Sequence, residues 1–216
     1  MLSKGLSKAQ TLEYVSTKVS LFRVPELMYF TIANYRKAPL DTIKKIQATF
    51  KDQNVAVRSS ASDEDGDSSA AAGEYDSVLD VKSNDSENLS QAIQTVISSI
   101  ESKRDCSPND EFIVQEMVEN SNMSGVIFTH DLNTGAPYYV INYDDTSGLT
   151  NTVTSGDNEY SNRTLYVYRG SSNSLRSNRF YDLLNATLEL EKILDSNLLD
   201  IEFALDSNFK PCLLQV

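Results

Sequence analysis

One segment of this chain combines an arginine with small and acidic residues in the way that phosphate binding requires. The apolar residues 55–57 lead into Arg58, Ser59 and Ser60, and a loop rich in serine, alanine, aspartate and glycine follows as far as Tyr75. Small residues let a polyphosphate approach the backbone closely, and an arginine can bind two phosphate oxygens at once. The segment therefore predicts a phosphate-binding loop.

Two other interpretations of this loop stay open from the sequence. One is a solvated acidic turn, because clusters of Ser, Asp and Gly commonly mark exposed turns. The other is a calcium loop, because four carboxylates occupy the first, third, fifth and twelfth positions of the EF-hand spacing: Asp63, Asp65, Asp67 and Glu74. Gly66 is misplaced for that motif, and a strand rather than a helix leads into the loop.

Two carboxylates near the end of the chain have the spacing of a metal site. Asp200 and Glu202 lie two residues apart in a strand-like segment, so both side chains point to one face. Such a pair repels unless a cation lies between the two groups, and Mg²⁺ prefers carboxylate oxygens together with substrate phosphates. We expect Gln215, on the next strand, to lie opposite them. An exposed acidic face is the alternative.

A third set of residues is suited to holding a nucleotide base. Residues 113–118 and 124–129 are rich in apolar and β-branched types, which is typical of core strands. The backbone of the first segment could bind the adenine edge while the side chain of Met117 or Val118 packs on the ring.

Composition excludes several other classes of function. The 216 residues are 40% hydrophobic and 23% charged, which is an ordinary globular balance. The net charge of −12 repels nucleic acid at long range, so we expect no DNA or RNA partner. Without a run of 18 apolar residues or a signal-peptide core, we expect a cytoplasmic protein with no membrane partner. One histidine, His130, and two distant cysteines cannot form a Ser-His-Asp triad or a zinc site.

The elements that must position these residues form an α+β chain. Helical spacing is found at residues 8–19, 40–50 and 89–100 and again from residue 180; strands are expected at 26–32, 54–59, 75–81, 112–118, 125–129, 138–143, 165–168, 198–205 and 209–215. The polar stretch 103–110 predicts a boundary between residues 1–107 and 108–216. The last strand ends without a turn or polar tail, so we expect a fragment of a longer multidomain protein.

Taken together, these segments resemble the N-terminal nucleotide-binding domain of the pyruvate phosphate dikinase and phosphoenolpyruvate synthase family. Residues 57–75 are similar to its V-R-S-S-A-x-x-E-D motif and following A-G-x-Y/F turn. Residues 114–118 and 124–135 match V-Q-x-M-V and S-G-V-x-F-T-x-D-x-x-T-G, and residues 200–215 match a D-I-E-W/F hairpin that ends in L-Q. Residues 7–12 resemble the family's lysine motif more weakly.

The resemblance implies an ATP-grasp-like α+β fold with two subdomains and the nucleotide site between them. The subdomain of residues 1–107 would carry Lys8 and the Arg58 loop. Lys8 and Arg58 would act catalytically on the phosphates. The subdomain of residues 108–216 would carry the adenine strand and the metal hairpin, where Glu202 and Gln215 would hold Mg²⁺ with Asp200 in support. The implied nucleotide-binding residues are Lys8, Arg58, Ser59, Gln115, Glu116, Met117, Val118, Gly125, Glu202 and Gln215.

The implied activity is that of an ATP-dependent phosphotransferase, of which this chain is an incomplete part. A histidine on another domain of the full-length protein would take a phosphoryl group from ATP and pass it to a small acceptor. The acceptor would be pyruvate or, as in compact glutamine-kinase-like members encoded with polysaccharide genes, an amide such as glutamine. The family's G-L-G-E segment reads Gly148-Leu149-Thr150-Asn151 here, so a non-catalytic nucleotide sensor or scaffold is the alternative.

Overall fold

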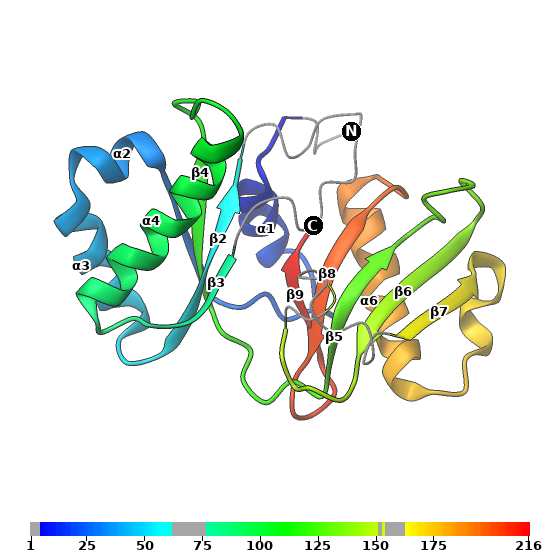
Figure 1. Ribbon diagram of the computed structural model, residues 1–216. Helices are drawn as coiled ribbons and strands as arrows, with labels where there is room; N and C mark the ends of the chain where they lie inside the picture. Colours follow the sequence, from blue (N-terminus) through cyan, green and yellow to red (C-terminus); the bar gives the residue numbers. More distant parts are fainter. Residues whose placement is uncertain (1–4, 62–76, 151–152, 154–162) are drawn as a thin grey trace. The chain divides into compact units, whose positions relative to one another are not determined.

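Two antiparallel sheets form the framework of the computed structural model (Figure 1). The structure describes residues 5–61, 77–150, 153 and 163–216. The chain divides into two compact units. The four-stranded unit consists of Leu6–Gln10 and Pro25–Met117, and the five-stranded unit consists of Gly5, Thr11–Val24 and Val118–Val216.

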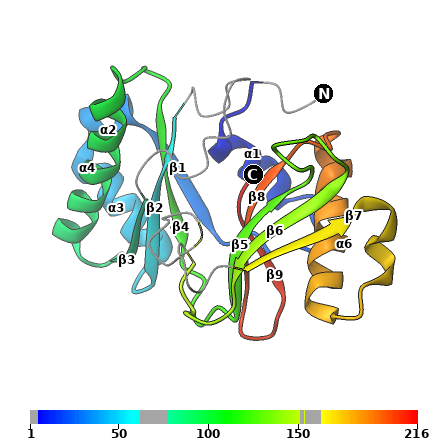
Figure 2. The same cartoon turned by 45° about the vertical axis from the view of Figure 1, so that its right-hand side comes forward.

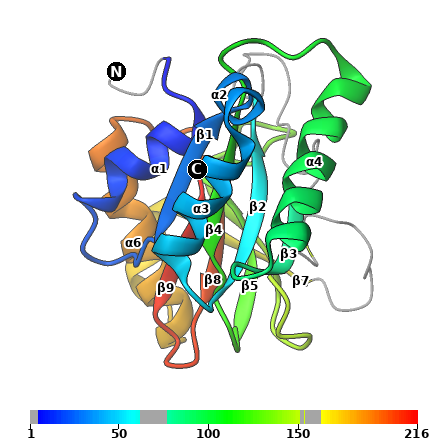
Figure 3. The same ribbon diagram turned by 90° about the vertical axis from the view of Figure 1, so that its left-hand side faces the viewer.

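The four-stranded unit has the strand order β1-β4-β2-β3. Its strands are β1 (Leu27–Thr31), β2 (Asn54–Ser60), β3 (Ser77–Lys82) and β4 (Glu111–Glu116). Its helices are α2 (Ile32–Lys37), α3 (Pro39–Phe50) and α4 (Ser86–Lys103) (Figure 3). These helices share one apolar core with the sheet, to which Val57 and Val114 contribute from the two central strands. Helix α1 (Lys8–Ser16) begins in this unit and continues into the other.

Local sequence signals explain where two of these helices begin. Asp85 is the N-cap of α4, and its carboxylate accepts hydrogen bonds from the backbone N–H groups of Glu87 and Asn88. Thr31 is the N-cap of α2 and accepts from the N–H of Asn34. Helix α2 was not expected from the sequence, because it follows β1 without any intervening turn residue.

The five-stranded unit has the strand order β7-β6-β5-β8-β9. Its strands are β5 (Met123–Phe128), β6 (Tyr138–Asp144), β7 (Arg163–Tyr168), β8 (Asp200–Leu205) and β9 (Pro211–Gln215). Helix α6 (Asn178–Leu194) lies along one side of this sheet (Figure 2). The 3₁₀ helix η1 (Arg169–Ser174) follows directly after β7.

A buried hydrogen-bonded group fixes α6 to its sheet. The Tyr139 hydroxyl donates to the Glu191 carboxylate over 3.1 Å, and Arg169 binds both oxygens of that carboxylate at 2.7 and 3.0 Å. Tyr139 is fully buried, and burial together with the Glu191 charge raises the pKa of its hydroxyl. The charge of Glu191 is compensated by the charge of Arg169, so this ion pair can be buried. The contacts of Tyr139, Arg169 and Glu191 connect β6, η1 and α6.

Most of the expected helices and strands are present. The two compact units and the two expected subdomains assign strand β4 differently. The polar stretch at residues 103–110 connects α4 to β4, and β4 is a central strand of the four-stranded sheet. The contact-based units therefore change at residues 117 and 118 rather than at 107 and 108. None of the described helices has the length and apolar character that crossing a membrane requires.

The carboxylate of Glu189 gives a prediction about acid stability. It accepts hydrogen bonds from the N–H and hydroxyl of Ser20 and from the N–H of Leu21. Burial raises the pKa of Glu189, but these hydrogen bonds outweigh burial and hold it below its usual 4.5. A lowered pKa in the folded state contributes stability at neutral pH that is lost as the pH falls through that pKa.

We expect the free energy of unfolding of the wild-type protein to fall more steeply than that of Glu189→Gln as the pH falls below about 4.5. The difference should be less than about 1 kcal/mol, because solvent screens interactions near the surface. Urea denaturation at several pH values measures this difference. Glu119→Gln removes an exposed carboxylate from the same unit and serves as the control. Equal pH slopes for the wild type and Glu189→Gln would contradict the assignment.

Candidate functional site

Arg58 lies on the face of the four-stranded sheet that points away from the helical core. Val55 and Val57 of β2 belong to that core, so Arg58 and Ser60 point to the opposite face. The register pairs Arg58 with Ile113 and Ala56 with Gln115, which places Gln115 on the same face as Arg58. Arg58 is only 5% exposed and Gln115 only 1%. The sheet thus positions both predicted residues on one face.

The start of α1 is fixed to this same face. Ser60 pairs with Glu111 in the register of β2 and β4. The Ser60 hydroxyl accepts from the N–H of Ala9 at 3.1 Å, and the Glu111 carboxylate accepts from the Ser7 hydroxyl at 2.5 Å and from the Gln10 side chain at 3.2 Å. The structure therefore brings the helical turn that contains Lys8 to the sheet end two residues beyond Arg58.

Sequence reasoning missed the residues that anchor Lys8, although a signal for them exists. Ser7 accepts from the N–H of Gln10 at 3.2 Å, and the Gln10 side chain accepts from the N–H of Ser7 at 3.4 Å. This reciprocal pair is a capping box with the S-x-x-Q pattern. The buried Glu111, which lies one strand away in the sheet and far away in sequence, has no comparable local signal.

Ser59 lies on the opposite side of β2 from Arg58. Ser59 pairs with Phe112 and lies on the side of Val57, so its side chain points away from the Arg58 face, which Ser60 shares instead. The small-residue loop of residues 62–76, including the carboxylates of the calcium hypothesis, lies outside the described residues.

The predicted adenine strand uses part of its backbone in the sheet. The N–H of Glu116 donates to the carbonyl of Glu26 at 2.8 Å, and the N–H of Met117 donates to the carbonyl of Asn54 at 3.1 Å. Val118 is 5% exposed and packs in a small core with Ala204, Cys212 and Leu214. These contacts fix the conformation of residues 116–118, and they commit two of the N–H groups to the protein.

The predicted metal hairpin has the register expected from the sequence. Glu202 of β8 pairs with Gln215 of β9, and a register shift follows before Phe203. Ile201 and Phe203 are fully buried, whereas Asp200 and Glu202 alternate with them and are half-buried on the other face. The set offers two carboxylates and one amide, which are hard oxygen donors of the kind that Mg²⁺ prefers. No group of three or more His, Cys, Asp or Glu side chains could hold a metal within the described ranges.

Gly125 of β5 has a packing role that its sequence motif does not reveal. A Cβ atom at this position would lie 2.0 Å from the carbonyl oxygen of Asn142 and 2.8 Å from the Cα of Tyr143. Both atoms belong to the backbone of the neighbouring strand β6 and cannot move aside like a flexible side chain. The close approach of β5 and β6 therefore requires glycine here.

Asp144 organises the segment that replaces the family's G-L-G-E sequence. Its buried carboxylate accepts hydrogen bonds from the N–H and hydroxyl groups of both Thr146 and Ser147. Gly148 follows with a φ of +73°, and the carbonyl of Leu149 accepts from the Ser124 hydroxyl at 2.6 Å. The described part of this segment is thus a defined turn attached to β5.

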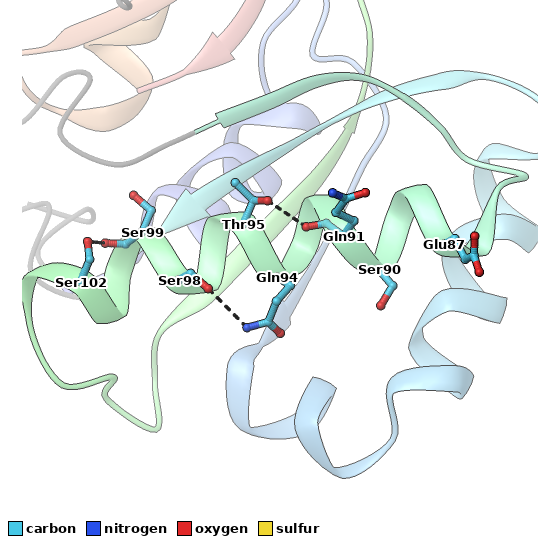
Figure 4. A pocket seen from close by; sticks show the side chains of 8 residues that line it. All are labelled: Glu87, Ser90, Gln91, Gln94, Thr95, Ser98, Ser99 and Ser102. Carbon is cyan, nitrogen blue, oxygen red and sulfur yellow. Dashed lines mark hydrogen bonds between the residues drawn. The ribbon is translucent and has the colours of Figure 1, made fainter.

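Other features of the surface lie apart from these residues. Polar side chains line a shallow hollow along the exposed face of α4, from Glu87 to Ser102 (Figure 4). A second hollow in the five-stranded unit is lined by residues of α6, of the segment 20–23 and of the β8–β9 turn. His130 uses Nδ1 to donate to the carbonyl of Asn197 at 2.8 Å, which is a structural contact.

The two α+β units and the matches below identify an ATP-binding domain with an ATP-grasp-like fold. A family model described as pyruvate phosphate dikinase, AMP/ATP-binding domain, matches residues 33–169. The chain belongs to this family of ATP-binding domains. The matched range contains Arg58, residues 115–118 and Gly125, whereas Lys8 and the hairpin of Glu202 and Gln215 lie outside it. No curated protein matches the chain.

Solved structures confirm the expected fold. The D-alanine-D-alanine ligase from Coxiella burnetii is 12% identical with a TM-score of 0.54, over 98% of this chain and 47% of that one. The D-alanyl-alanine synthetase A from Vibrio cholerae O1 biovar eltor is 14% identical with a TM-score of 0.53, over 99% of this chain and 54% of that one. The chain spans about half the length of these proteins, and the likeness concerns the fold alone.

The Gly125 contact predicts a large difference between two glycine substitutions. Gly125→Ala forces β5 and β6 apart, and we expect a loss of about 2 kcal/mol or more in the free energy of unfolding. Gly135→Ala is the control, because its Cβ meets no atom within 4 Å and only its φ of +67° is unfavourable, which costs about 1 kcal/mol. Chemical denaturation measures both variants. Equal losses would show that the Asn142 contact does not require glycine.

Proposed function

We propose that this chain is the ATP-binding module of a dikinase-type phosphotransferase. The observation that carries the proposal is the attachment of the Lys8 turn to the Arg58 face through Ser60 and Glu111. A lysine near the start of α1 and an arginine on β2 would together suit a polyphosphate, because fixed charges stabilise a transferring phosphoryl group without reorganisation. Membership in a family of AMP/ATP-binding domains supports the same ligand.

Each of the predicted residues would contribute to binding Mg·ATP. Lys8 and Arg58 bind the phosphates and stabilise the charge that develops on the transferred group, while Ser59 contributes to nucleotide binding from the end of β2. Residues 115–118 bind adenine, and Gly125 belongs to the strand next to the metal hairpin. Glu202 and Gln215, with Asp200 in support, hold Mg²⁺, which would neutralise phosphate charge when bound.

The proposed phosphotransfer needs a phosphate carrier and an acceptor in addition to ATP. We propose that a carrier histidine on another domain takes the phosphoryl group from ATP and passes it to a small acceptor, pyruvate or an amide such as glutamine. A cytoplasmic location would supply the ATP. A non-catalytic nucleotide sensor or scaffold is the second candidate, and the departure from G-L-G-E at Thr150 and Asn151 favours it.

Substitution of Arg58 and Glu202 tests the proposal. Calorimetry should detect Mg·ATP binding to the wild type, and both Arg58→Lys and Glu202→Gln should weaken it about tenfold or more, because each removes a charged or bidentate contact. Arg36→Lys, an exposed arginine paired with Glu101, is the matched control and should bind normally. Wild-type affinity in both test variants would contradict the proposed phosphate and metal sites.

The two candidate functions differ in the fate of the phosphate. The full-length protein should incorporate acid-labile phosphate from radiolabelled ATP if it transfers the group to a histidine, and Arg58→Lys should lower that incorporation. A protein that binds Mg·ATP tightly without acquiring label would instead be the sensor or scaffold.

The adenine strand predicts discrimination between bases. Since the N–H groups of Glu116 and Met117 already donate to Glu26 and Asn54, adenine would be bound by the N–H of Val118 and by carbonyls of the segment. Inosine triphosphate reverses the donor and acceptor pattern of the adenine edge, so we expect it to bind at least about tenfold more weakly than ATP, in line with the cost of unpaired polar groups. Competition calorimetry measures the ratio, and equal affinity would contradict this placement of the base.

A further inference from the structure

A row of side chains crosses the five-stranded sheet on the same face as the predicted metal hairpin. Glu202 pairs with Val126 of β5, and Val126 pairs in turn with Asn142 of β6. Asn142 then pairs with Thr164 of β7. Directly paired residues point to the same face of a sheet, so these four side chains and Gln215 share one face.

The contacts of α6 identify this face as the one that α6 does not cover. Tyr139 and Tyr143 of β6 both contact α6, through Glu191 and through the ring of Phe180 at 5.2 Å. Asn142 adjoins Tyr143 in the strand and therefore points to the opposite side. Ile201 and Phe203 flank Glu202 in the same way and are fully buried.

The amide of Asn142 is held in one orientation. The Thr164 hydroxyl donates to Asn142 Oδ1 at 2.8 Å. The two ends of a carboxamide diverge, so the NH₂ end of Asn142 is turned away from Thr164 and presents two donors. Asn142 is half-buried, whereas Val126, which separates it from Glu202, is an apolar residue only 3% exposed.

The spacing of the row matches a phosphate chain bound at the hairpin. Asn142 and Glu202 stand two strands apart, about 10 Å between Cα atoms. A cation held by Glu202 and Gln215 would bring phosphate oxygens over Val126, within reach of a side chain on β6. Donors that point at such oxygens form strong, charge-assisted hydrogen bonds.

We propose that Asn142 is a further nucleotide-binding residue that donates a hydrogen bond to a phosphate oxygen of ATP, and that Thr164 is the positioning residue that orients its amide. This inference rests on the proposed ATP-binding function and adds a contact to the same site. Asn142 confers preference for the phosphorylated ligand, because its contact is absent when adenosine alone is bound.

The test compares ATP with adenosine in matched variants of this chain. Calorimetry with Mg·ATP should show a rise of about tenfold in Kd for Asn142→Ala and a larger rise for Asn142→Asp, whose carboxylate repels the phosphates. NMR titration with adenosine should give the wild-type Kd for both variants. Asn133→Asp adds the same charge on an exposed turn of the same unit and should leave ATP binding unchanged.

Thr164 separates positioning from simple packing. Thr164→Val keeps the shape but removes the hydroxyl, and should weaken Mg·ATP about threefold in line with a lost neutral hydrogen bond, whereas Thr164→Ser should bind as the wild type does. If Asn142→Asp fails to fold, Asn142→Ala and the Thr164 pair carry the test.

Each outcome distinguishes this inference from the function on which it rests. A wild-type chain that does not bind Mg·ATP would overturn the proposed function. ATP binding in the wild type that Asn142→Ala leaves unchanged, or weakens equally for adenosine, would overturn the role of Asn142 alone. Weakening by Asn142→Ala without any effect of Thr164→Val would overturn the positioning role of Thr164.

Discussion

The hydrogen bonds to the Glu111 carboxylate hold the helical turn that contains Lys8, one of the two predicted phosphate-binding residues. Glu111 is 5% exposed, so its charge has lost most of its hydration and must be compensated by hydrogen bonds from the protein. Ser7 and Gln10 supply them, and both residues belong to the capping box that begins α1. Removing the carboxylate would therefore disturb the helix start, the position of Lys8 and the face that carries Arg58 at the same time.

Strand alternation gives each sheet one face that packs against helices and a second face that carries the predicted site residues. In the four-stranded unit, Val57 and Val114 face the helices, while Arg58 and Gln115 face away from them. In the five-stranded unit, Ile201 and Phe203 are buried, while Glu202 shares its face with Asn142. The same two-residue period thus provides a stable core and a surface on which polar groups are held at fixed spacings.

The sequence predicted the features that depend on local pattern, and it failed where distant strands decide the outcome. The strands around Arg58 and the pairing of Glu202 with Gln215 follow from periodicity and turn residues. The requirement for glycine at position 125 arises from the backbone of β6. The residues next to Gly125 in the sequence do not reveal this requirement. Helix α2 was missed because it follows β1 without a turn residue that would mark where the strand ends.

The discontinuous composition of the two units limits how this protein can change during evolution. The first three residues of α1 belong to one unit and the rest of the helix to the other, and the chain passes between the units again at residues 24–25 and 117–118. No single recombination point delivers one unit whole, and an exchange near residue 10 would cut a helix. The two units are therefore expected to be inherited together, and new specificities should arise by point substitution on their polar faces rather than by exchange of units.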